Sequence, residues 1–266
     1  MNDVTRQGRF DGKVAMVTGA GSGMGAAVAR QLAVEGARAV VLADVNAEAV
    51  ERVADELAAG HAVALDVSDP AAVDAAVADA VRRFGRLDIL VHAAGVDDPE
   101  AKQLIADALV EGRQPEVTDR LGDAAWRRVT RINLDGTFHV LRAAVRAMRP
   151  VGAGAIVVVG SSSAFDTPVG YPHYAASKAG VHALSQAVAK EVISSGIRVN
   201  VVAPGPTETG MAARTPAALR GGFADPRVRP YATPEEIADI VLFLASEAAA
   251  NLVGAVLLAN GGRFTA

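Results

Sequence analysis

Short apolar runs alternate with longer, alanine-rich segments of helical periodicity along almost the whole chain. The runs are apolar at nearly every position, which is typical of strands that are covered on both faces. We therefore predict seven buried strands, at residues 14–18, 39–43, 62–65, 87–91, 155–159, 197–203 and 255–258. Helices are predicted between them, at residues 24–35, 47–59, 70–84, 124–148, 174–194 and 234–245.

Residues at the ends of these segments support the helix boundaries. Asp69 and Thr233 stand at expected N-caps, each directly before a proline, and Gly60 follows the second helix as an expected C-cap. Gly136 predicts a kink within the longest helix. The alternation predicts an α/β fold: a single-domain Rossmann fold over residues 1–266, with a doubly wound parallel sheet of about seven strands and helices on both faces.

Three segments fall outside the alternation. They are a polar N-terminal tail at 1–11, an insertion at 97–122 with a short helix predicted at 100–110, and a loop at 205–232 rich in Gly, Pro and Arg. Ligand sites in open α/β sheets lie beyond the carboxyl ends of the strands, so the last two segments are candidate walls or lids of a site. We expect 205–232 to be the substrate loop, whereas 97–122 is either a site wall or a plain surface insertion.

Composition and charge exclude several classes of protein. Apolar residues make up 51% and aromatic residues only 4%, which predicts an ordered protein with an aliphatic core. A net charge of −4 gives no basic surface for nucleic acid or an anionic membrane. The chain has no cysteine, which excludes disulfides, thiolate metal sites and a cysteine nucleophile, and we expect no metal site. With neither a membrane-length apolar run nor a signal peptide, we expect a soluble, cytoplasmic protein.

A glycine-rich string joins the first strand to the first helix: Thr18-Gly19-Ala20-Gly21-Ser22-Gly23-Met24-Gly25. A dinucleotide pyrophosphate needs a tight turn, close backbone approach and a helix N-terminus directed at it, and glycines allow all three. Asp44 ends the next strand about twenty residues later, where a carboxylate can bind the adenosine ribose hydroxyls. The combination predicts dinucleotide binding, although the string alone is also compatible with an ordinary turn.

Asp44 also bears on the choice of cofactor. A carboxylate repels a 2′-phosphate, and neither Ser22 nor Val45 is a basic residue that would neutralise one. We therefore expect NAD(H) rather than NADP(H). The alternative for Asp44 is a residue that caps the next helix.

Tyr174 and Lys178 lie four residues apart at the start of a predicted helix. Residues at this spacing share a helix face, so both side chains can point into one cleft. A nearby ammonium lowers the pKa of a phenol and suits it to proton transfer. Taken alone, the pair is more typical of a half-buried tyrosine with an unrelated, solvated lysine.

Together, these features resemble the classical short-chain dehydrogenase/reductase family over residues 12–262. Thr18 to Gly25 matches the TGxxxGxG pattern of that family, and Tyr174 with Lys178 matches its YxxxK pair. Ser161 stands at the family's spacing for the catalytic serine, thirteen residues before Tyr174. The remaining matches are Asn133 as the helix asparagine, Asp66-Val67 as the adenine-binding pair, and Pro204-Gly205 with Thr209 as the PGxxxT stretch.

The resemblance implies a role for each catalytic residue. Tyr174 donates or accepts the substrate proton, Lys178 lowers the pKa of Tyr174 and binds the nicotinamide ribose, and Ser161 binds the substrate oxygen. Asn133 holds a water through its main-chain carbonyl. The implied NAD-binding residues are Thr18, Gly19, Gly21, Ser22, Gly23, Met24, Gly25, Asp44, Asp66, Val67, Ala93, Ala94, Gly95, Tyr174, Lys178, Pro204, Gly205, Thr207 and Thr209. The resemblance also implies a homotetramer that pairs helices 124–148 and 174–194 between subunits.

One departure is the sequence His92-Ala93-Ala94-Gly95, where the family has NNAG. Ala93 lacks the side chain that braces the sheet in the family, but the backbone contacts to the cofactor should survive. We expect a structural role for His92. His173 either borders the mouth of the site or lies in solvent.

Neighbouring serines are also assigned by their position. Ser163 is a candidate pocket residue, Ser162 is expected to be structural, and Ser177 is expected to form a local hydrogen bond beside the cofactor.

The sequence therefore predicts an NAD(H)-dependent oxidoreductase that interconverts a secondary alcohol and a ketone. The alternatives are a catalytically idle NAD-binding member of the same fold and a 3-oxoacyl-thioester reductase. The loop after Thr209 has four arginines and one acid, Asp225, which suggests an anionic substrate, or else a solvated lid. The arginines are Arg214, Arg220, Arg227 and Arg229.

Overall fold

The computed structural model describes residues 8–220 and 231–266, except for the side chains of Ala218 and Arg220. Within these residues, a parallel sheet of seven strands has the order β3-β2-β1-β4-β5-β6-β7. The doubly wound α/β fold predicted from the sequence is thus confirmed. The strands are β1 (Val14–Thr18), β2 (Ala39–Asp44), β3 (Gly60–Ala64), β4 (Ile89–His92), β5 (Gly154–Val159), β6 (Ile197–Pro204) and β7 (Val256–Ala259).

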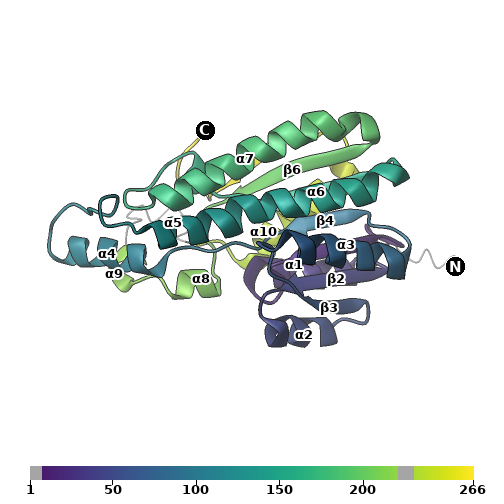
Figure 1. Cartoon of the computed structure of the whole chain (residues 1–266), viewed down its shortest axis with the longest axis horizontal. Helices are drawn as coiled ribbons and strands as arrows, with labels where there is room; N and C mark the ends of the chain where they lie inside the picture. Colours follow the sequence, from purple (N-terminus) through teal and green to yellow (C-terminus); the bar gives the residue numbers. More distant parts are fainter. Residues whose placement is uncertain (1–7, 221–230) are drawn as a thin grey trace, which may run out of the picture.

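Helices cover both faces of the sheet (Figure 1). On one face α1 (Gly23–Val34), α2 (Ala47–Asp55) and α10 (Pro234–Ala245) pack on it through small aliphatic side chains. On the other face lie α3 (Pro70–Phe84), α6 (Gly136–Met148) and α7 (Pro172–Val192). Because both faces are covered, the central strands are buried at nearly every position, as their continuous apolar sequence requires.

The N-caps predicted for two of these helices are confirmed. The Asp69 carboxylate accepts from the backbone of Ala71 and Ala72 at the start of α3. The Thr233 hydroxyl accepts from Glu236, whose side chain accepts in return from the Thr233 amide. The chain before β1 is partly buried, since Phe10 is 1% exposed.

The predicted helix 124–148 is interrupted just before Gly136. It consists of α5 (Asp123–Thr130), a π-helical turn (Arg131–Asp135) and α6. In the turn, the main-chain carbonyl of Asn133 accepts a hydrogen bond from the Thr137 hydroxyl at 2.5 Å. Such π turns are frequent at functional sites because they redirect backbone carbonyls and one side chain.

The predicted helix 47–59 is wrong at its end. α2 stops at Asp55, and Gly60 begins β3 rather than capping a helix. A Cβ at Gly60 would lie 2.4 Å from the Ala54 carbonyl oxygen, so this glycine permits close packing of α2 against β3. A glycine is thus required at position 60, but for close packing against α2 rather than for a helix C-cap.

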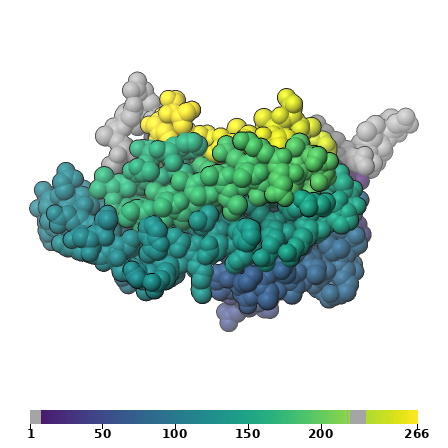
Figure 2. Space-filling view, turned by 45° about the horizontal axis from the view of Figure 1, so that its top comes forward, coloured from purple at the N-terminus to yellow at the C-terminus, as the bar shows by residue number. Residues whose placement is uncertain are grey.

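Segments beyond the carboxyl ends of the strands gather at one end of the molecule. There lie α4 (Pro99–Val110), α8 (Gly210–Ala213) and α9 (Ala217–Arg220) (Figure 1). Figure 2 shows the α4 segment, coloured blue-teal, forming that end, with α6 and α7 exposed along one face and the C-terminal residues beside α7. No helix in the described ranges is both long and apolar enough to cross a membrane.

Candidate active site

The turn after β1 requires glycine at several positions. Gly19 has φ +70°, and a Cβ there would lie 2.6 Å from the Ala94 amide nitrogen. A Cβ at Gly25 would lie 2.2 Å from the Gly19 carbonyl oxygen. The α1 N-cap, Ser22, makes no side-chain capping bond, which leaves the amides of the first turn to an anionic group. The turn therefore fits the pyrophosphate of a dinucleotide.

Asp44 is fixed beside this turn at the end of β2. Its Oδ2 accepts from the Gly21 amide at 3.0 Å, and its Oδ1 accepts from the Asn46 amide at 2.9 Å. A Cβ at Gly21 would lie 3.0 Å from the carboxylate, so glycine allows this contact. The neighbouring Val45 is 74% exposed. The Asp44 carboxylate therefore lies beside the glycine-rich turn, as the sequence predicted.

Asp66 and Val67 follow β3 on the same edge of the sheet. The Asp66 carboxylate accepts from both the amide and the hydroxyl of Ser68, at 2.8 and 2.7 Å. These bonds lower the pKa of Asp66. Val67 is buried, and its carbonyl contacts the His139 ring at 3.1 Å. The pair thus offers an ordered loop at the position expected for adenine.

His92 provides a brace between β1 and β4. Its Nδ1 lies 2.7 Å from the Thr18 hydroxyl, and the Ala93 amide donates to the Thr18 carbonyl at 3.1 Å. Burial, followed by the charge of Lys178, lowers the pKa of His92 to about 3, so the imidazole is neutral. The structural role expected for His92 is confirmed. The imidazole braces the sheet although the family's asparagines are absent.

Ser161, Tyr174 and Lys178 are brought together at the end of β5 and the start of α7. The Lys178 ammonium donates to the Val159 carbonyl at 3.0 Å, and Tyr174 forms a hydrogen bond with Ser161. The Ser161 Oγ also accepts from the Ser163 amide at 3.1 Å. Of the two residues expected to point into one cleft, Tyr174 lines the adjoining cavity, whereas Lys178 is buried and is held by the Val159 carbonyl.

Burial has the largest effect on the pKa values of Tyr174 and Lys178. It raises the pKa of Tyr174, the hydrogen bond from Ser161 lowers it, and the charge of Asp97 raises it further. Burial lowers the pKa of Lys178 to about 8. The net direction for Tyr174 is thus opposite to the lowering expected from Lys178, because burial of the phenol, which disfavours the charged phenolate, is the largest effect on its pKa.

Asn133 ties the segment after β4 to α7. Its side chain donates to the Val96 carbonyl at 3.0 Å and accepts from the Val96 amide at 2.8 Å. It also donates to the Ser177 hydroxyl at 3.1 Å, and Ser177 in turn donates to the Tyr174 carbonyl at 2.8 Å. A Cβ at Gly95 would lie 3.5 Å from the Lys178 ammonium. Asn133 thus fixes the backbone around Tyr174 and Lys178, and the local hydrogen bond expected of Ser177 is present.

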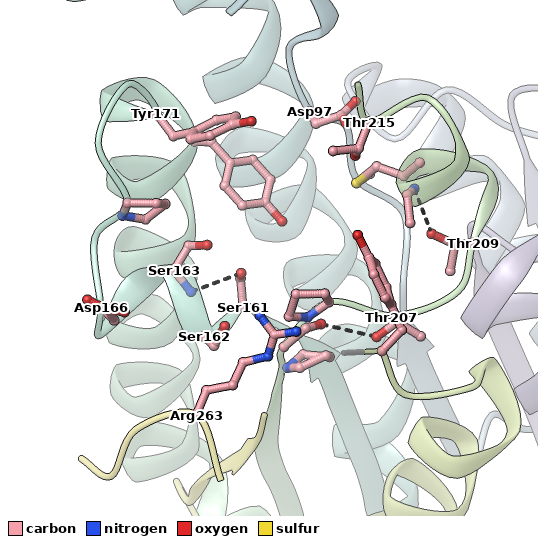
Figure 3. A pocket seen from close by; sticks show the side chains of 18 of the residues that line it. Asp97, Ser161, Ser162, Ser163, Asp166, Tyr171, Thr207, Thr209, Thr215 and Arg263 are labelled. Carbon is pink, nitrogen blue, oxygen red and sulfur yellow. Dashed lines mark hydrogen bonds between the residues drawn. The ribbon is translucent and has the colours of Figure 1, made fainter. Parts of the chain in front are cut away.

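A cavity of about 700 Å³ opens between the carboxyl end of the sheet and the loops that follow it (Figure 3). Its walls come from the insertion, the segment after Ser161, the substrate loop and the C-terminal tail. Ser163 lines it as expected, but Ser162 also lines it, which corrects the purely structural role given to Ser162. The lining residues with candidate roles are Met24, Asp97, Lys102, Ser161, Ser162, Ser163, Tyr171, Tyr174, Pro204, Gly205, Thr207, Thr209, Met211, Thr215 and Arg263.

The insertion 97–122 forms a wall of this cavity. Asp97 is buried and makes an ion pair with Lys102. The Lys102 ammonium also donates to the Thr215 hydroxyl at 3.0 Å and to the Met211 carbonyl at 3.1 Å. The buried Lys102 therefore joins the insertion to the expected substrate loop, which favours the site-wall alternative for residues 97–122. Arg214 lies 3.8 Å from Asp97.

The rest of the expected arginine cluster is not described. The side chain of Arg220 and the whole of Asp225, Arg227 and Arg229 lie outside the described residues.

His173 neither borders the site nor lies in solvent. It is fully buried, and its Nε2 lies 3.0 Å from the Asp98 carboxylate. Asp98 also caps α4 by accepting from the Glu100 amide at 3.0 Å. Both expectations for His173 were wrong, because the insertion covers the start of α7 and supplies a buried acid as partner.

Three site residues were missed in the sequence. His182 stands four residues after Lys178 on the face of α7 that holds Tyr174, a spacing that was available as a signal. Lys102 interrupts the apolar face of α4, where the neighbouring Ala101, Ile105 and Ala106 are buried. Arg263 follows two glycines, which predict a turn in the chain. They do not predict that the turn brings Arg263 to the cavity.

Comparisons with known proteins agree with this geometry. A family model described as short chain dehydrogenase matches residues 13–219. The chain is 42% identical to cis-4-hydroxycyclohexanecarboxylate dehydrogenase of Sinomonas cyclohexanicum, over 95% of this chain and 97% of that protein. It is also 42% identical to galactitol 2-dehydrogenase (L-tagatose-forming) of Cereibacter sphaeroides, over 96% of each.

A solved structure has the same architecture. The crystal structure titled ribose-5-phosphate isomerase from Brucella melitensis 16M superposes with a TM-score of 0.82 at 34% identity, covering 95% of this chain and 92% of that one. Fold, site geometry and relatives converge, and the chain belongs to the classical short-chain dehydrogenase/reductase family.

Proposed function

We propose that the protein is an NAD(H)-dependent oxidoreductase that interconverts a secondary alcohol and a ketone, with Tyr174 as the general acid and base. One observation carries the proposal: Ser161 and Tyr174 are hydrogen-bonded to each other and line a cavity that reaches Met24 of the glycine-rich turn. Lys178 follows Tyr174 by four residues on α7. Such an arrangement supports binding of a substrate oxygen at Tyr174 with a nicotinamide beside it.

Each of the site residues has a separate role in the proposed reaction. In the oxidising direction, the substrate hydroxyl proton passes to the Tyr174 phenolate, while Ser161 holds the substrate oxygen by a hydrogen bond. NAD⁺, when bound, supplies the hydride acceptor for the substrate carbon. The products are a ketone, NADH and a proton that leaves Tyr174. Lys178 binds the nicotinamide ribose, and its positive charge opposes the rise that burial causes in the Tyr174 pKa.

NAD(H) is favoured over NADP(H) by the position of Asp44. The Gly21 amide holds its carboxylate beside the glycine-rich turn, where it can bind the hydroxyls of the adenosine ribose. A 2′-phosphate there would meet this negative charge, and the exposed Val45 beside it has no charge to offset the repulsion.

The names of the relatives support oxidation of an alcohol on a small polar molecule, since one names a hydroxycyclohexanecarboxylate and the other a sugar alcohol. A catalytically idle protein is less well supported, because Asn133, Ser161, Tyr174 and Lys178 are all present, and hydrogen bonds link both Ser161 and, through Ser177, Asn133 to Tyr174. A 3-oxoacyl-thioester reductase shares this chemistry and differs only in the substrate.

The experiment is a panel assay that follows NADH absorbance. Secondary alcohols, polyols, hydroxy acids and, in reverse, 3-oxoacyl thioesters are tested with wild type and Tyr174→Phe. We expect turnover of at least one alcohol, lowered about 10²-fold or more by Tyr174→Phe, with NAD affinity nearly unchanged. Turnover retained in Tyr174→Phe, or none with any substrate despite NAD binding, contradicts the proposal.

We also propose that the protein is cytoplasmic and forms a homotetramer through α5–α6 and α7. This face is open in Figure 2, and it exposes Trp126 and Phe138, at 43% and 47%. Light scattering at micromolar concentration tests the assembly, and a monomer would contradict it.

A further inference from the structure

The insertion 97–122 fixes the position of Tyr171 in the cavity wall. The side chain of Tyr171 packs against a small cluster of buried apolar residues from the insertion, Ala101, Ile105 and Val117. Gly170 precedes it with φ +85°, and a Cβ there would lie 2.6 Å from the Ile105 side chain. Because only glycine leaves room for this contact, the insertion and the turn before Tyr171 are packed as one unit.

The backbone of Tyr171 is held at the start of α7. Its carbonyl accepts from the Ala175 amide at 2.9 Å, and its amide donates to the Pro168 carbonyl at 3.4 Å. Pro172 follows as the first residue of α7. Tyr171 is therefore a fixed side chain three residues before Tyr174, and both tyrosines line the same cavity.

The hydroxyl of Tyr171 points toward Asp97 (Figure 3). Asp97 acts on Tyr171 through its charge, and no hydrogen bond joins these two described side chains. Burial, followed by the charges of Asp97, Asp98 and Tyr174, raises the pKa of Tyr171, so the phenol keeps its proton at neutral pH. The Tyr171 hydroxyl is thus a hydrogen-bond donor for which the described residues provide no acceptor.

Asp97 has one carboxylate oxygen that can still accept a hydrogen bond. Its Oδ2 is buried and pairs with Lys102. Its Oδ1 lies 3.8 Å from the Arg214 guanidinium, which is beyond hydrogen-bond distance. The neighbouring Asp98 is engaged elsewhere, because it caps α4 and contacts the buried His173. A donor and an acceptor therefore face the same part of the cavity without bonding to each other.

We infer that Tyr171 and Asp97 bind a second hydroxyl of the substrate and make the enzyme selective for diols and polyols over alcohols with a single hydroxyl. Tyr171 donates to the oxygen of this hydroxyl, which in turn donates its own proton to Oδ1 of Asp97. A hydroxyl satisfies both groups, whereas an ether or carbonyl oxygen has no proton to donate and a carboxylate would be repelled by Asp97. The inference rests on the proposed alcohol oxidation at Tyr174 and adds the class of substrate.

The test compares cyclohexanol with the cis-1,2-, cis-1,3- and cis-1,4-cyclohexanediols, which differ from it only in the second hydroxyl. We expect wild type to favour at least one diol about ten- to a hundredfold in kcat/KM, the range of a neutral and a charge-assisted hydrogen bond together. Fluorine in place of the second hydroxyl of the preferred diol has a similar size but no proton to donate, so it should remove most of this preference. Equal kcat/KM for cyclohexanol and every diol overturns the inference.

A pair of conservative variants makes the result specific. Tyr171→Phe removes the donor but keeps the ring that packs on the insertion, so we expect KM for the preferred diol to rise about three- to tenfold, with kcat and the kinetics of cyclohexanol nearly unchanged. Tyr231→Phe is the matched control, because Tyr231 lines the same cavity and acts on Arg263. It should keep the preference. Loss of the preference in Tyr231→Phe alone, or an unchanged preference in a folded Tyr171→Phe protein, overturns the inference.

A binding measurement separates this inference from the proposed function. Protein loaded with NADH cannot oxidise an alcohol, so calorimetry measures alcohol binding without turnover. We expect at least one diol to bind wild type more tightly than cyclohexanol does, and Tyr171→Phe to lose this difference. If no alcohol is oxidised but this pattern holds, the proposed function fails and the hydroxyl site stands. If alcohols are oxidised but diols and cyclohexanol bind equally, the inference alone fails.

Discussion

The Nε2 atom of His182 accepts a hydrogen bond from the backbone amide of Ser161 at 3.3 Å. The geometry places the ring proton on Nδ1, so Nε2 presents a lone pair to the amide. Burial, followed by the charge of Lys178, lowers the pKa of His182 to about 4, which keeps the ring neutral near pH 7. A Cβ at Gly160 would lie 2.2 Å from Nε2, so the glycine before Ser161 allows the ring to reach it. His182 thus holds Ser161, the proposed catalytic serine, by its backbone.

We predict that His182 acts as a positioning residue. His182→Leu removes the acceptor, and we expect kcat to fall about tenfold with KM for NAD unchanged, because Ser161 loses its fixed orientation. His182→Gln keeps an acceptor at a similar distance and should recover most of the activity. Steady-state kinetics on both variants checks this. Equal loss in both, or a change confined to thermal stability, would show that the ring only fills space.

The cofactor preference should depend on Asp44 and Val45. Wild type should show a higher kcat/KM with NAD than with NADP, measured with any working substrate. Asp44→Ala combined with Val45→Arg relieves the repulsion and adds a phosphate partner, so we expect the ratio to move at least about tenfold toward NADP. A wild type that uses NADP equally well would contradict the assignment.

NAD affinity should fall as the pH rises through about 8. Burial lowers the pKa of Lys178 to about 8, and only the ammonium form can donate all its hydrogen bonds to the ribose. Below this pH the lysine is charged and binding is strongest, and above it the affinity should fall by up to about tenfold per pH unit. Fluorescence titration with NAD between pH 7 and 9.5 measures the effect. Lys178→Met should bind weakly at every pH, and a wild-type slope that persists in this variant would assign the titration elsewhere.

Acid should destabilise the fold through His92. Its pKa is about 3 in the folded chain and near 6.5 when unfolded, so between these values the unfolded chain binds a proton that the native chain does not. The contribution of His92 to the free energy of unfolding is therefore fully present above pH 6.5. As the pH falls below 6.5, this contribution decreases by up to about 1.4 kcal/mol per pH unit. His92→Asn removes the titration and should flatten this slope in urea unfolding at pH 7 and pH 5.

The matched control for that experiment is His139→Gln, at a half-buried ring on α6. This variant should retain the slope of wild type. Some slope should remain in His92→Asn, because His182 also has a lowered pKa. An identical slope in wild type and His92→Asn would contradict the prediction.

The sequence by itself determined the sheet, the cradle and the catalytic spacing, because these are local or periodic properties of the chain. Continuous apolar runs specify strands buried on both faces, as β1 and β5 show. Glycine spacing specifies a turn with no room for side chains, and a spacing of four on α7 specifies that Tyr174 and Lys178 share a face.

The tertiary structure decided what depends on contacts between distant segments. Three examples depend on how loops from different strands meet at one edge of the sheet. They are the contact of His173 with Asp98, the contact of Lys102 with the substrate loop, and the position of Arg263 in the cavity wall. The direction of the Tyr174 pKa shift belongs here too, because burial is a property of the packed chain and outweighs the effect expected from the neighbouring charge. The hydrophobic periodicity of the sequence does not predict these contacts. The conformation of an irregular loop depends on the residues of other segments that it packs against, and these are known only from the folded structure.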